Sequence, residues 1–513
     1  MARKKSLQDQ PTVSKRSRLK APVYLLLAAL LFGMFYGRNL SGDVWWHLKT
    51  GQWIVQNRAL PFVDPFSYTA RSPMILHEWG AEVVEWLAYR LSPSALAAMS
   101  VLLISAAFVL AFRNALSRSG RVLSSFLVVA AGASAAAGSS EMRPQVFSFV
   151  FLALTVLVLQ QYHERGGRIL WLLAPLMVVW VNFHSVFLVG LALIALEAVL
   201  AALAPPKWAL GRPFPRFAAA GPLVAVAVVS GLLALVNPNG AGPFVYPFHV
   251  MHDPQATRLT NEWTSPNYHE WTGRSLLVLM ALAAIGLASL PGRPALRDFA
   301  YVAVFAVASL LSRRNSTLFA IACAGPIALW LASAESAVRS WLSLRSLERA
   351  ADRAVWGILA ALVALLFLWR VSDAQGRRPF DYMNMSEVFP AQACDFIAAS
   401  HLSGPMFNEY NHGGYLIWRL YPQHRVFVDS RQEPFLGGAF EEWMYASNSA
   451  GPGVWQEVFD RRKINFAVLS PASALVSVLA ERRDWVCVYQ DDKAVIFVRN
   501  IPANAAVIRA AVR

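Results

Sequence analysis

The sequence predicts a mostly α protein, in which a polytopic membrane helix bundle of about eleven spans precedes a C-terminal extracytoplasmic α/β domain. Of the 513 residues, 56% are apolar and 15% are charged, which is too hydrophobic for an ordinary soluble protein. About eleven apolar stretches have roughly the 16–20 residues that cross ~30 Å of hydrocarbon at ~1.5 Å per residue. After about residue 372 the composition is that of a globular domain.

The predicted spans follow one another through the first 371 residues. They are 21–37, 94–112, 122–138, 146–162, 168–183, 185–203, 217–236, 274–290, 298–312, 315–333 and 354–371. The chain therefore divides into a basic tail, 1–20, a transmembrane bundle, 21–371, and a C-terminal domain, 372–513.

The distribution of basic residues predicts which side of the membrane each segment faces. The tail 1–20 is rich in lysine and arginine and is expected in the cytoplasm. It lacks the small-residue cleavage site of a signal peptide, so we expect the first span to be retained. With eleven crossings, the cation-rich loops fall inside and the C-terminal domain falls outside. The two long outward loops are then 38–93 and 237–273.

The net charge of +15 does not require a nucleic-acid partner. The cations gather at cytoplasmic helix ends, where they orient the chain and meet anionic lipid headgroups, so no nucleic acid is expected. Of the three cysteines, Cys394 and Cys487 would face the outside, either as a disulfide or as free thiols. No cysteine–histidine spacing indicates structural zinc.

The first outward loop contains two predicted helices, 43–56 and 78–91, separated by proline-rich turns. The first is rich in tryptophan and is expected to lie along the membrane interface. The second outward loop is long and aperiodic, which is more typical of a functional loop than of a linker.

The C-terminal region alternates strand and helix patterns. Strands are expected at 405–408, 426–429, 465–469, 485–490 and 494–498, and helices at 413–421, 439–448 and 472–482. The last two strands form a predicted hairpin, and the whole indicates a mixed sheet. The segments 408–415 and 429–431 follow strands, a position that often binds ligands.

Asp43 is the first candidate catalytic residue, because it directly follows the first span. A partly desolvated carboxylate there could take a proton from an acceptor hydroxyl, and His47 stands one helical turn further on. The alternative is that Asp43 caps the helix that follows, and the two roles are compatible.

Further along the same loop, His77-Glu78-Trp79 forms a second acidic site, in which Glu78 could bind substrate or simply begin a helix. Asp64, before Pro65, is expected to form a turn by accepting hydrogen bonds from backbone amides.

Three arginines lie on the outward side, where the positive-inside rule disfavours them. Arg143 precedes the fourth span, and Arg313 and Arg314 lie between two spans with no long loop. A bound phosphate or pyrophosphate would explain them, because guanidinium groups bind such anions with two parallel hydrogen bonds. The alternative is pairing with Glu262 or Glu141.

His184 closes the fifth span and could either bind substrate or be a satisfied structural group. Glu262 could orient a sugar hydroxyl or pair with an arginine. Trp263 and Trp271 could stack on a sugar ring, although tryptophans are common anchors at membrane interfaces. The sequence contains no P-loop, HExxH motif or nucleophile elbow.

These features resemble the C-type glycosyltransferase superfamily (GT-C), integral-membrane enzymes that use polyprenyl-phosphate-linked sugars. The chain is similar in detail to a group of bacterial glycosyltransferase-like membrane proteins, and this resemblance implies a location in the bacterial inner (plasma) membrane. The motifs that carry this likeness are Asp43-Val44-Trp45-Trp46-His47-Leu48, Gly51-Gln52-Trp53-Ile54, Pro61, Asp64-Pro65-Phe66-Ser67-Tyr68-Thr69, Phe407-Asn408 and Gly413-Gly414-Tyr415-Leu416.

The resemblance implies an inverting transfer of a sugar from a polyprenyl-phosphate donor to a glycan, lipid or protein acceptor at the extracytoplasmic face, with Asp43 as the base. The chain departs from the family in three respects. Position 44 is valine where O-mannosyltransferases tend to have an acid, no Lys-Pro-Pro element follows, and the Asp-x-Asp metal motif is absent from the first loop. No residue is therefore assigned to a metal, and a divalent metal requirement stays open.

A competing hypothesis is a non-catalytic transport or polysaccharide-assembly protein, such as a flippase or an export partner. A transporter would place polar residues at mid-membrane and at both faces, whereas the predicted spans are apolar runs. That difference favours the enzyme.

Overall fold

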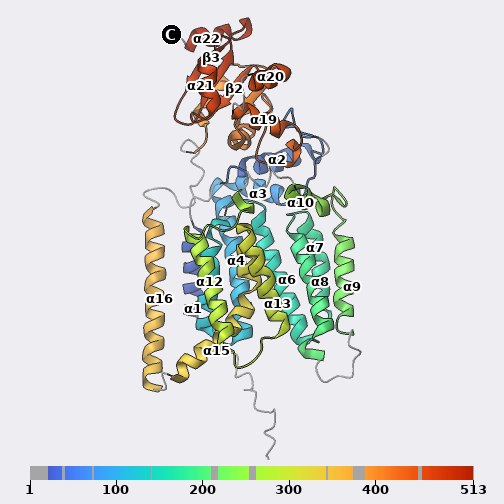
Figure 1. Ribbon diagram of the computed structural model, residues 1–513, viewed down its shortest axis with the longest axis vertical. Helices are drawn as coiled ribbons and strands as arrows, with labels where there is room; N and C mark the ends of the chain where they lie inside the picture. The colour runs from blue at the N-terminus through green and yellow to red at the C-terminus, as the bar shows by residue number, and fades with distance from the viewer. Residues whose placement is uncertain are drawn as a thin grey trace, which may run out of the picture.

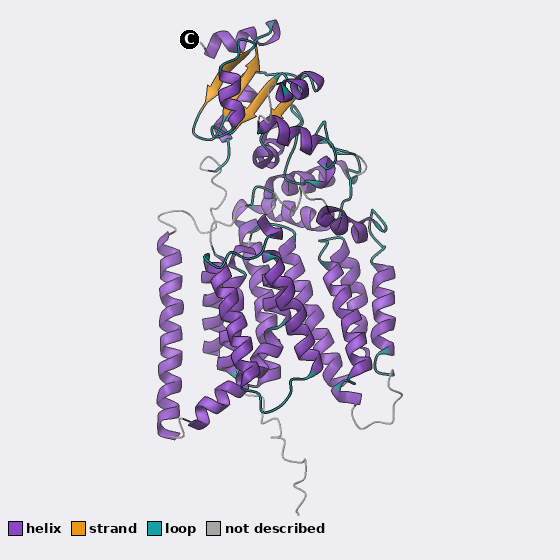
Figure 2. Ribbon diagram, in the orientation of Figure 1, coloured by secondary structure: helices purple, strands orange, loops and turns teal. Residues whose placement is uncertain are grey.

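The computed structural model describes residues 21–36, 41–71, 74–139, 141–209, 218–252, 261–341, 345–373, 388–448 and 453–511. The basic tail 1–20, parts of both outward loops and the start of the predicted C-terminal domain lie outside these residues. The chain is mostly helical: a bundle of upright helices carries a small α/β domain at one end (Figures 1 and 2).

Eleven predicted spans correspond to helical segments of the bundle. These are α1 (Ala21–Phe35), α4 (Pro93–Ser119), α5 (Val122–Ala135), α6 (Gln145–Arg165), η2 with α7 (Arg168–Leu172 and Leu173–Val181), α8 (Phe187–Leu203), α9 (Gly221–Leu233), α12 (Trp271–Ala288), α13 (Leu296–Leu311), α14 with α15 (Ser316–Ala322 and Ala324–Trp341) and α16 (Arg345–Asp373).

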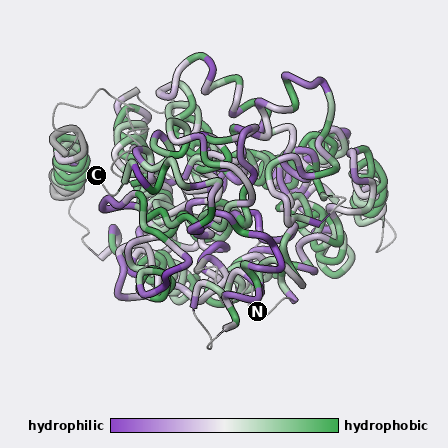
Figure 3. The backbone as a smooth tube through the Cα atoms, turned by 90° about the horizontal axis from the view of Figure 1, so that it is seen from above, coloured by the Kyte–Doolittle hydropathy of each residue, from purple (hydrophilic) through white to green (hydrophobic). Residues whose placement is uncertain are grey.

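Four helical segments among the described residues are long and apolar enough to cross a membrane: Pro93–Ser119, Gln145–Arg165, Phe187–Ala209 and Trp271–Ala288. A fifth is the pair Arg313–Ala322 and Ala324–Trp341, which is bent by 64°. Five shorter apolar helices of 10–17 residues accompany them. Viewed from above, the upright helices are coloured largely as hydrophobic (Figure 3). The chain is thus a multi-pass membrane protein by composition, and the count of eleven crossings stays a prediction.

The apolar faces of the helices pack into one continuous core, but two buried ion pairs interrupt it. Arg118 at the end of α4 binds both carboxylate oxygens of Asp298 at 2.7 Å. Arg297 binds Glu197 of α8 at 2.5 Å. From the sequence alone, the spans are plain apolar runs and the arginines at their cytoplasmic ends serve only to orient the chain. The structure instead uses them to tie α4, α8 and α13 together, since an unpaired buried charge would be costly.

Three further helices, α2 (Val44–Asn57), α3 (Trp79–Leu91) and α10 (Gly242–His252), lie between the bundle and the C-terminal domain (Figure 1). The predicted helices 43–56 and 78–91 are confirmed as α2 and α3. Trp45 of α2 does not face a membrane: it is buried beneath the C-terminal domain and packs edge-on against Tyr415, with ring centroids 5.3 Å apart. Large aromatic surface is thus buried between the first loop and the domain.

The C-terminal domain contains a four-stranded mixed sheet in the order β1-β2-β4-β3. Its strands are β1 (Met406–Asn408), β2 (Phe466–Leu469), β3 (Trp485–Gln490) and β4 (Val495–Arg499), and its helices are α17 (Ala391–Ala399), α18 (Gly413–Leu420), α19 (Ala439–Ser447), α20 (Val454–Arg461), α21 (Ala474–Ala480) and α22 (Ala505–Ala511). β1 and β2 are parallel, and the other pairs are antiparallel. The predicted hairpin is confirmed.

The predicted strand 426–429 is wrong. The segment is buried and makes only one isolated bridge, Ser67 to Val426. The side chain of Asn408 takes the place of a neighbouring strand, since it accepts from the Phe427 amide at 2.7 Å and donates to the Val428 carbonyl at 2.8 Å. The cysteines are free thiols, with Cys394 buried and Cys487 exposed, so no disulfide forms.

A glycine sets the close crossing of α2 and α3. A Cβ atom on Gly51 would lie 2.1 Å from the backbone carbonyl oxygen of Glu82, closer than real contacts allow. Gly51 stands one helical turn after His47, so the same close approach brings His47 to Glu82.

We predict that Gly51→Ala destabilises the protein by about 1–3 kcal/mol, because the clash is with backbone atoms that cannot rotate away. The thermal unfolding midpoint of the detergent-purified protein should fall. Gly231→Ala is the matched control, because Gly231 lies within helix α9 and its Cβ would meet open space. Equal midpoints for the two variants would contradict the close crossing.

Candidate functional site

A cavity of about 940 Å³ lies at the end of the bundle that faces the C-terminal domain. All eight residues predicted for the site line it: Asp43, His47, Glu78, Arg143, His184, Glu262, Arg313 and Arg314. The first and second outward loops, the ends of several bundle helices and the C-terminal domain all contribute to its wall. The structure therefore brings together residues that are far apart in the sequence, and their roles stay predictions.

Arg143, just before α6, gathers three carboxylates in one wall of this cavity. It lies 2.7 Å from Asp43 Oδ2 and 3.1 Å from Glu141 Oε2, and it also pairs with Glu262. Burial alone would lower the pKa of Arg143, but the three carboxylates outweigh burial and raise it. The pairing with Glu141 and Glu262 that the sequence left open is therefore present, together with a pair to Asp43.

The carboxylate of Asp43 has one partner from the bundle and one from the C-terminal domain. It occupies the N-cap position of α2, but its side chain accepts no capping hydrogen bond. Oδ2 instead meets Arg143, and Oδ1 accepts a hydrogen bond from the Ser430 hydroxyl of the C-terminal domain. The Trp46 indole in turn donates to Ser430 Oγ at 3.2 Å. The capping interpretation of Asp43 is thus wrong for the side chain, which faces the cavity.

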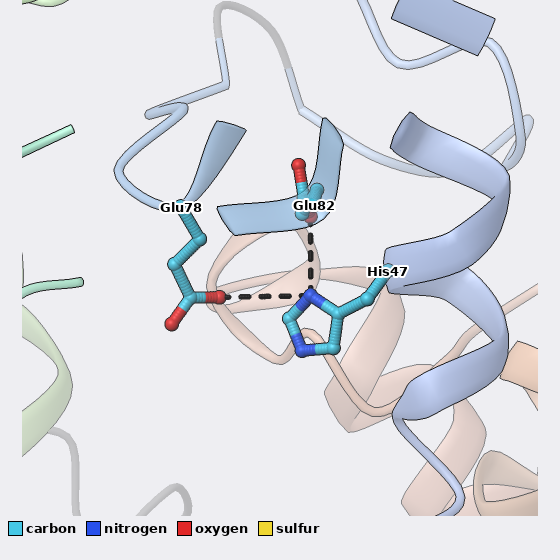
Figure 4. A group of neighbouring side chains, drawn as sticks. All are labelled: His47, Glu78 and Glu82. Atoms are coloured by element: carbon cyan, nitrogen blue, oxygen red, sulfur yellow. Dashed lines mark hydrogen bonds and ion pairs between the residues drawn. The ribbon is translucent and has the colours of Figure 1, made fainter. Parts of the chain in front are cut away.

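A second polar cluster lies further along the same wall, where His47 of α2 meets α3 (Figure 4). His47 Nδ1 is 3.2 Å from Glu82 Oε1 and 3.8 Å from Glu78 Oε2. Glu78 begins α3 without capping it, so its carboxylate is free to face the cluster. His77 Nε2 and His184 Nε2 lie 3.5 Å and 3.4 Å from Glu78 Oε1.

Burial and neighbouring charges both shift the pKa values of the carboxyl groups in this cluster. Burial alone would raise the pKa of Glu78, but the imidazoles of His77, His47 and His184 lower it well below its usual range. Burial raises the pKa of Glu85 to about 8, assisted by the Glu82 and Glu78 carboxylates and opposed by His47. The pKa values of neighbouring carboxyl groups are thus shifted in opposite directions, as is common at functional sites.

His184 is buried between α7 and α8 and has partners on both nitrogens. Nδ1 is 3.0 Å from Ser148 Oγ, and Nε2 accepts from Arg314 Nη2 at 3.3 Å. Burial, reinforced by the positive charge of Arg314, lowers the pKa of His184 to about 3, although Glu78 opposes this shift. The Nε2 atom of His184 thus lies beside both Arg314 Nη2 and Glu78 Oε1.

The two arginines of η5 (Arg313–Asn315) differ in their partners. Arg314 lies 4.0 Å from Glu262 Oε2 and 5.5 Å from the centre of the Trp263 ring. Arg313 has no ion-pair partner among the described residues, although its backbone amide binds the Thr264 carbonyl at 2.9 Å. Trp263 thus packs against a cation, whereas Trp271 is largely exposed at the start of α12.

The wall contributed by the C-terminal domain is anchored by a buried ionic triad. Arg431 binds Asp429 Oδ2 at 2.6 Å and Asp64 Oδ2 of the first loop at 2.8 Å. Asp64 also accepts from the Phe66 and Ser67 amides at 3.0 Å and 3.2 Å, as the turn interpretation expected. The triad fixes Ser430, the neighbour of Arg431, against Asp43.

Three residues at or beside the site are not among the candidates predicted from the sequence: Glu82, Glu85 and Ser430. Glu82 lies four residues after Glu78 and Glu85 three residues later, so all three face one side of α3. That spacing was visible in the sequence. Ser430 was noted only as part of a segment after a predicted strand, and its contact with Asp43 depends on how the domain docks.

No family model matches the sequence, and no curated protein matches it. The structure is similar to that of the oligosaccharyltransferase AglB of Archaeoglobus fulgidus in complex with an inhibitory peptide and a dolichol-phosphate. The TM-score is 0.54 at 13% identity, covering 88% of this chain and 69% of AglB. The apo form of the A. fulgidus oligosaccharyltransferase gives 0.51 at 12% identity, with 87% and 69% covered.

ArnT of Cupriavidus metallidurans bound to undecaprenyl phosphate gives a TM-score of 0.49 at 14% identity, covering 94% of this chain and 98% of ArnT. The resemblance to GT-C glycosyltransferases seen in the sequence is confirmed at the level of the fold.

We predict that Arg431→Leu destabilises the protein by about 3–5 kcal/mol, because Asp64 and Asp429 would remain buried without their counter-charge. The unfolding midpoint in detergent should fall, and the C-terminal domain should become easier to cleave by protease. Arg461→Leu is the control, since Arg461 is exposed and its ion pairs contribute at most about 1 kcal/mol. A midpoint as high as that of the control would show that the triad does not hold the domain.

Proposed function

We propose that this GT-C-fold protein is a membrane glycosyltransferase that moves a sugar from a polyprenyl-phosphate donor to an acceptor at the extracytoplasmic face. The observation that carries the proposal is that Asp43, which pairs with Arg143, lines the same cavity as Arg313 and Arg314. A carboxylate that can accept a proton and guanidinium groups that can bind a phosphate are the two parts that this transfer requires.

The cavity is lined by both polar and apolar residues, as binding of a lipid-linked substrate requires. Its polar wall holds the arginines and carboxylates, whereas another part of its lining consists of apolar residues of α8 and α10. Among these, Phe248 and Met251 of α10 are more than half exposed. An isoprenoid chain could lie against this apolar surface while its phosphate meets the arginines.

Asp43 is the proposed general base. Each carboxylate oxygen has two acceptor positions, so Asp43 can bind Arg143 and Ser430 and still accept a hydrogen bond from an acceptor hydroxyl. It would take that proton as the hydroxyl oxygen attacks the anomeric carbon and the bond to the lipid phosphate breaks. Attack from the side opposite the phosphate would invert the anomeric configuration.

The arginines would stabilise the departing phosphate. Arg143 is already surrounded by three carboxylates, so its charge is largely neutralised. Arg313 has no ion-pair partner among the described residues, and Arg314 has only the distant Glu262. The pair at η5 is therefore better suited to an anionic substrate than Arg143 is. The sequence likewise favours Arg313 and Arg314 over Arg143 as an anion site, because this pair lies between two apolar spans with no long loop.

We predict that Asp43→Asn lowers sugar transfer by at least about 100-fold, because the amide cannot take a proton. The assay measures release of polyprenyl phosphate from lipid-linked sugars extracted from the host membrane, with the variant reconstituted in vesicles. Asp395→Asn is the control, since Asp395 pairs with Arg419 on the exposed surface of the domain. Full transfer by the Asp43→Asn protein would remove Asp43 from the role of base.

We also predict that Arg313→Gln weakens binding of polyprenyl phosphate by about tenfold or more, as expected when one charge-assisted hydrogen bond is lost. Binding is measured on the detergent-purified protein with the lipid phosphate as titrant. Arg274→Gln is the matched control, because Arg274 is exposed in the first turn of α12 and does not line the cavity. Equal affinities of the two variants would argue against a phosphate site at Arg313.

A further inference from the structure

The side chains of His47, Glu78 and Glu82 converge in a way that their ion pairs alone do not explain. One ligand atom from each lies within 4.8 Å of the other two (Figure 4). Nδ1 of His47 is 3.2 Å from Glu82 and 3.8 Å from Glu78. Around a tetrahedral ion bound at roughly 2.0–2.2 Å, neighbouring ligand atoms are about 3.4 Å apart. The two distances from His47 Nδ1 are close to that spacing, and the two carboxylate oxygens lie within 4.8 Å of each other.

We propose that His47, Glu78 and Glu82 bind one divalent transition-metal ion of the zinc class on the wall of the cavity. This goes beyond the proposed transfer reaction, because the ion would be present in the resting protein without donor or acceptor. The site is separate from Asp43, whose positive partner is Arg143 rather than an ion.

A buried carboxyl group with an unpartnered oxygen stands beside these three ligands. Glu85 stands one turn beyond Glu82 on the same face of α3, and it is 1% exposed. Its Oε2 atom is buried and has no hydrogen-bond partner among the described residues. Unpaired buried polar atoms are uncommon and call for a partner.

The surroundings of Glu78 orient it as a ligand. Its Oε1 atom faces His77 and His184 at 3.5 Å and 3.4 Å, which leaves Oε2 directed towards His47. The ring of His77 is itself held by the Ile75 carbonyl at 3.2 Å from Nδ1, and that of His184 by Ser148. Partners that fix the ligands in this way are typical of metal sites.

The ligand types and the open side define the class of ion. One imidazole nitrogen with two carboxylates suits zinc or manganese, whereas copper(I) prefers sulfur, and calcium and magnesium prefer oxygen alone. All three residues line the cavity. An ion with three protein ligands therefore keeps a coordination position that faces the cavity, as in reactive rather than structural sites. That position would take water or an oxygen of an anionic substrate.

The test is the metal content of the full-length protein, purified in detergent through a tag without histidines and without added metal or chelator. We expect about one equivalent of a divalent transition metal per chain by mass spectrometry. After chelation and dialysis, Zn²⁺ alone should rebind. His47→Ala and Glu82→Gln should each weaken that rebinding by at least about 10- to 100-fold.

Two controls keep the result interpretable. His252→Ala and Glu481→Gln remove an exposed histidine and an exposed glutamate far along the chain, and both should retain the metal. Glu82→Gln preserves shape, and its fold is checked by gel filtration and the unfolding midpoint. Two results would overturn the site. One is a wild-type protein that contains no metal and does not rebind Zn²⁺, and the other is unchanged rebinding by the His47→Ala and Glu82→Gln variants. The metal content can be measured without a sugar donor. A negative result in the transfer assay therefore does not affect the metal site, and a negative metal result does not affect the proposed transfer reaction.

Discussion

The guanidinium group of Arg143 holds together the loops that form one wall of the cavity. Arg143 comes from the connection before α6, and its three carboxylate partners come from the start of α2, from its own loop and from the second outward loop. Each carboxylate would repel the others if Arg143 were absent, and the charge of Arg143 would be costly so close to the hydrocarbon without them. The outward loops are therefore held over the bundle by a shared charge, and Asp43 is placed at the edge of the cavity as a result.

The C-terminal domain completes this arrangement. Trp45 is buried in an aromatic contact with the domain, and the triad of Asp64, Asp429 and Arg431 ties the domain to the first loop through a buried ion pair on each side. These contacts bring the hydroxyl of Ser430 to Asp43. The candidate site is thus shared between the membrane bundle and the domain, and neither part contains it alone.

Much of this architecture could be predicted, because apolar length, charge and strand alternation are local properties of the sequence. Eleven apolar stretches correspond to helical segments, and the terminal hairpin forms as expected. Asp43 and Arg143 could be selected because a charge beside a span stands out. The strand at 426–429 could not be judged correctly, since the Asn408 side chain replaces the missing neighbour. Ser430 and the convergence of His47 with Glu82 depend on docking and on the Gly51 crossing, which only tertiary structure reveals.

If one cavity holds both the carboxylate that takes the proton and the phosphate of the donor, an experimental structure of the protein with bound polyprenyl phosphate will show both together. We expect the phosphate within hydrogen-bond distance of Arg313 or Arg314, in the same cavity as Asp43, with the isoprenoid chain along α8 and α10. A phosphate bound elsewhere, with Asp43 facing bulk solvent away from the lipid, would rule this arrangement out.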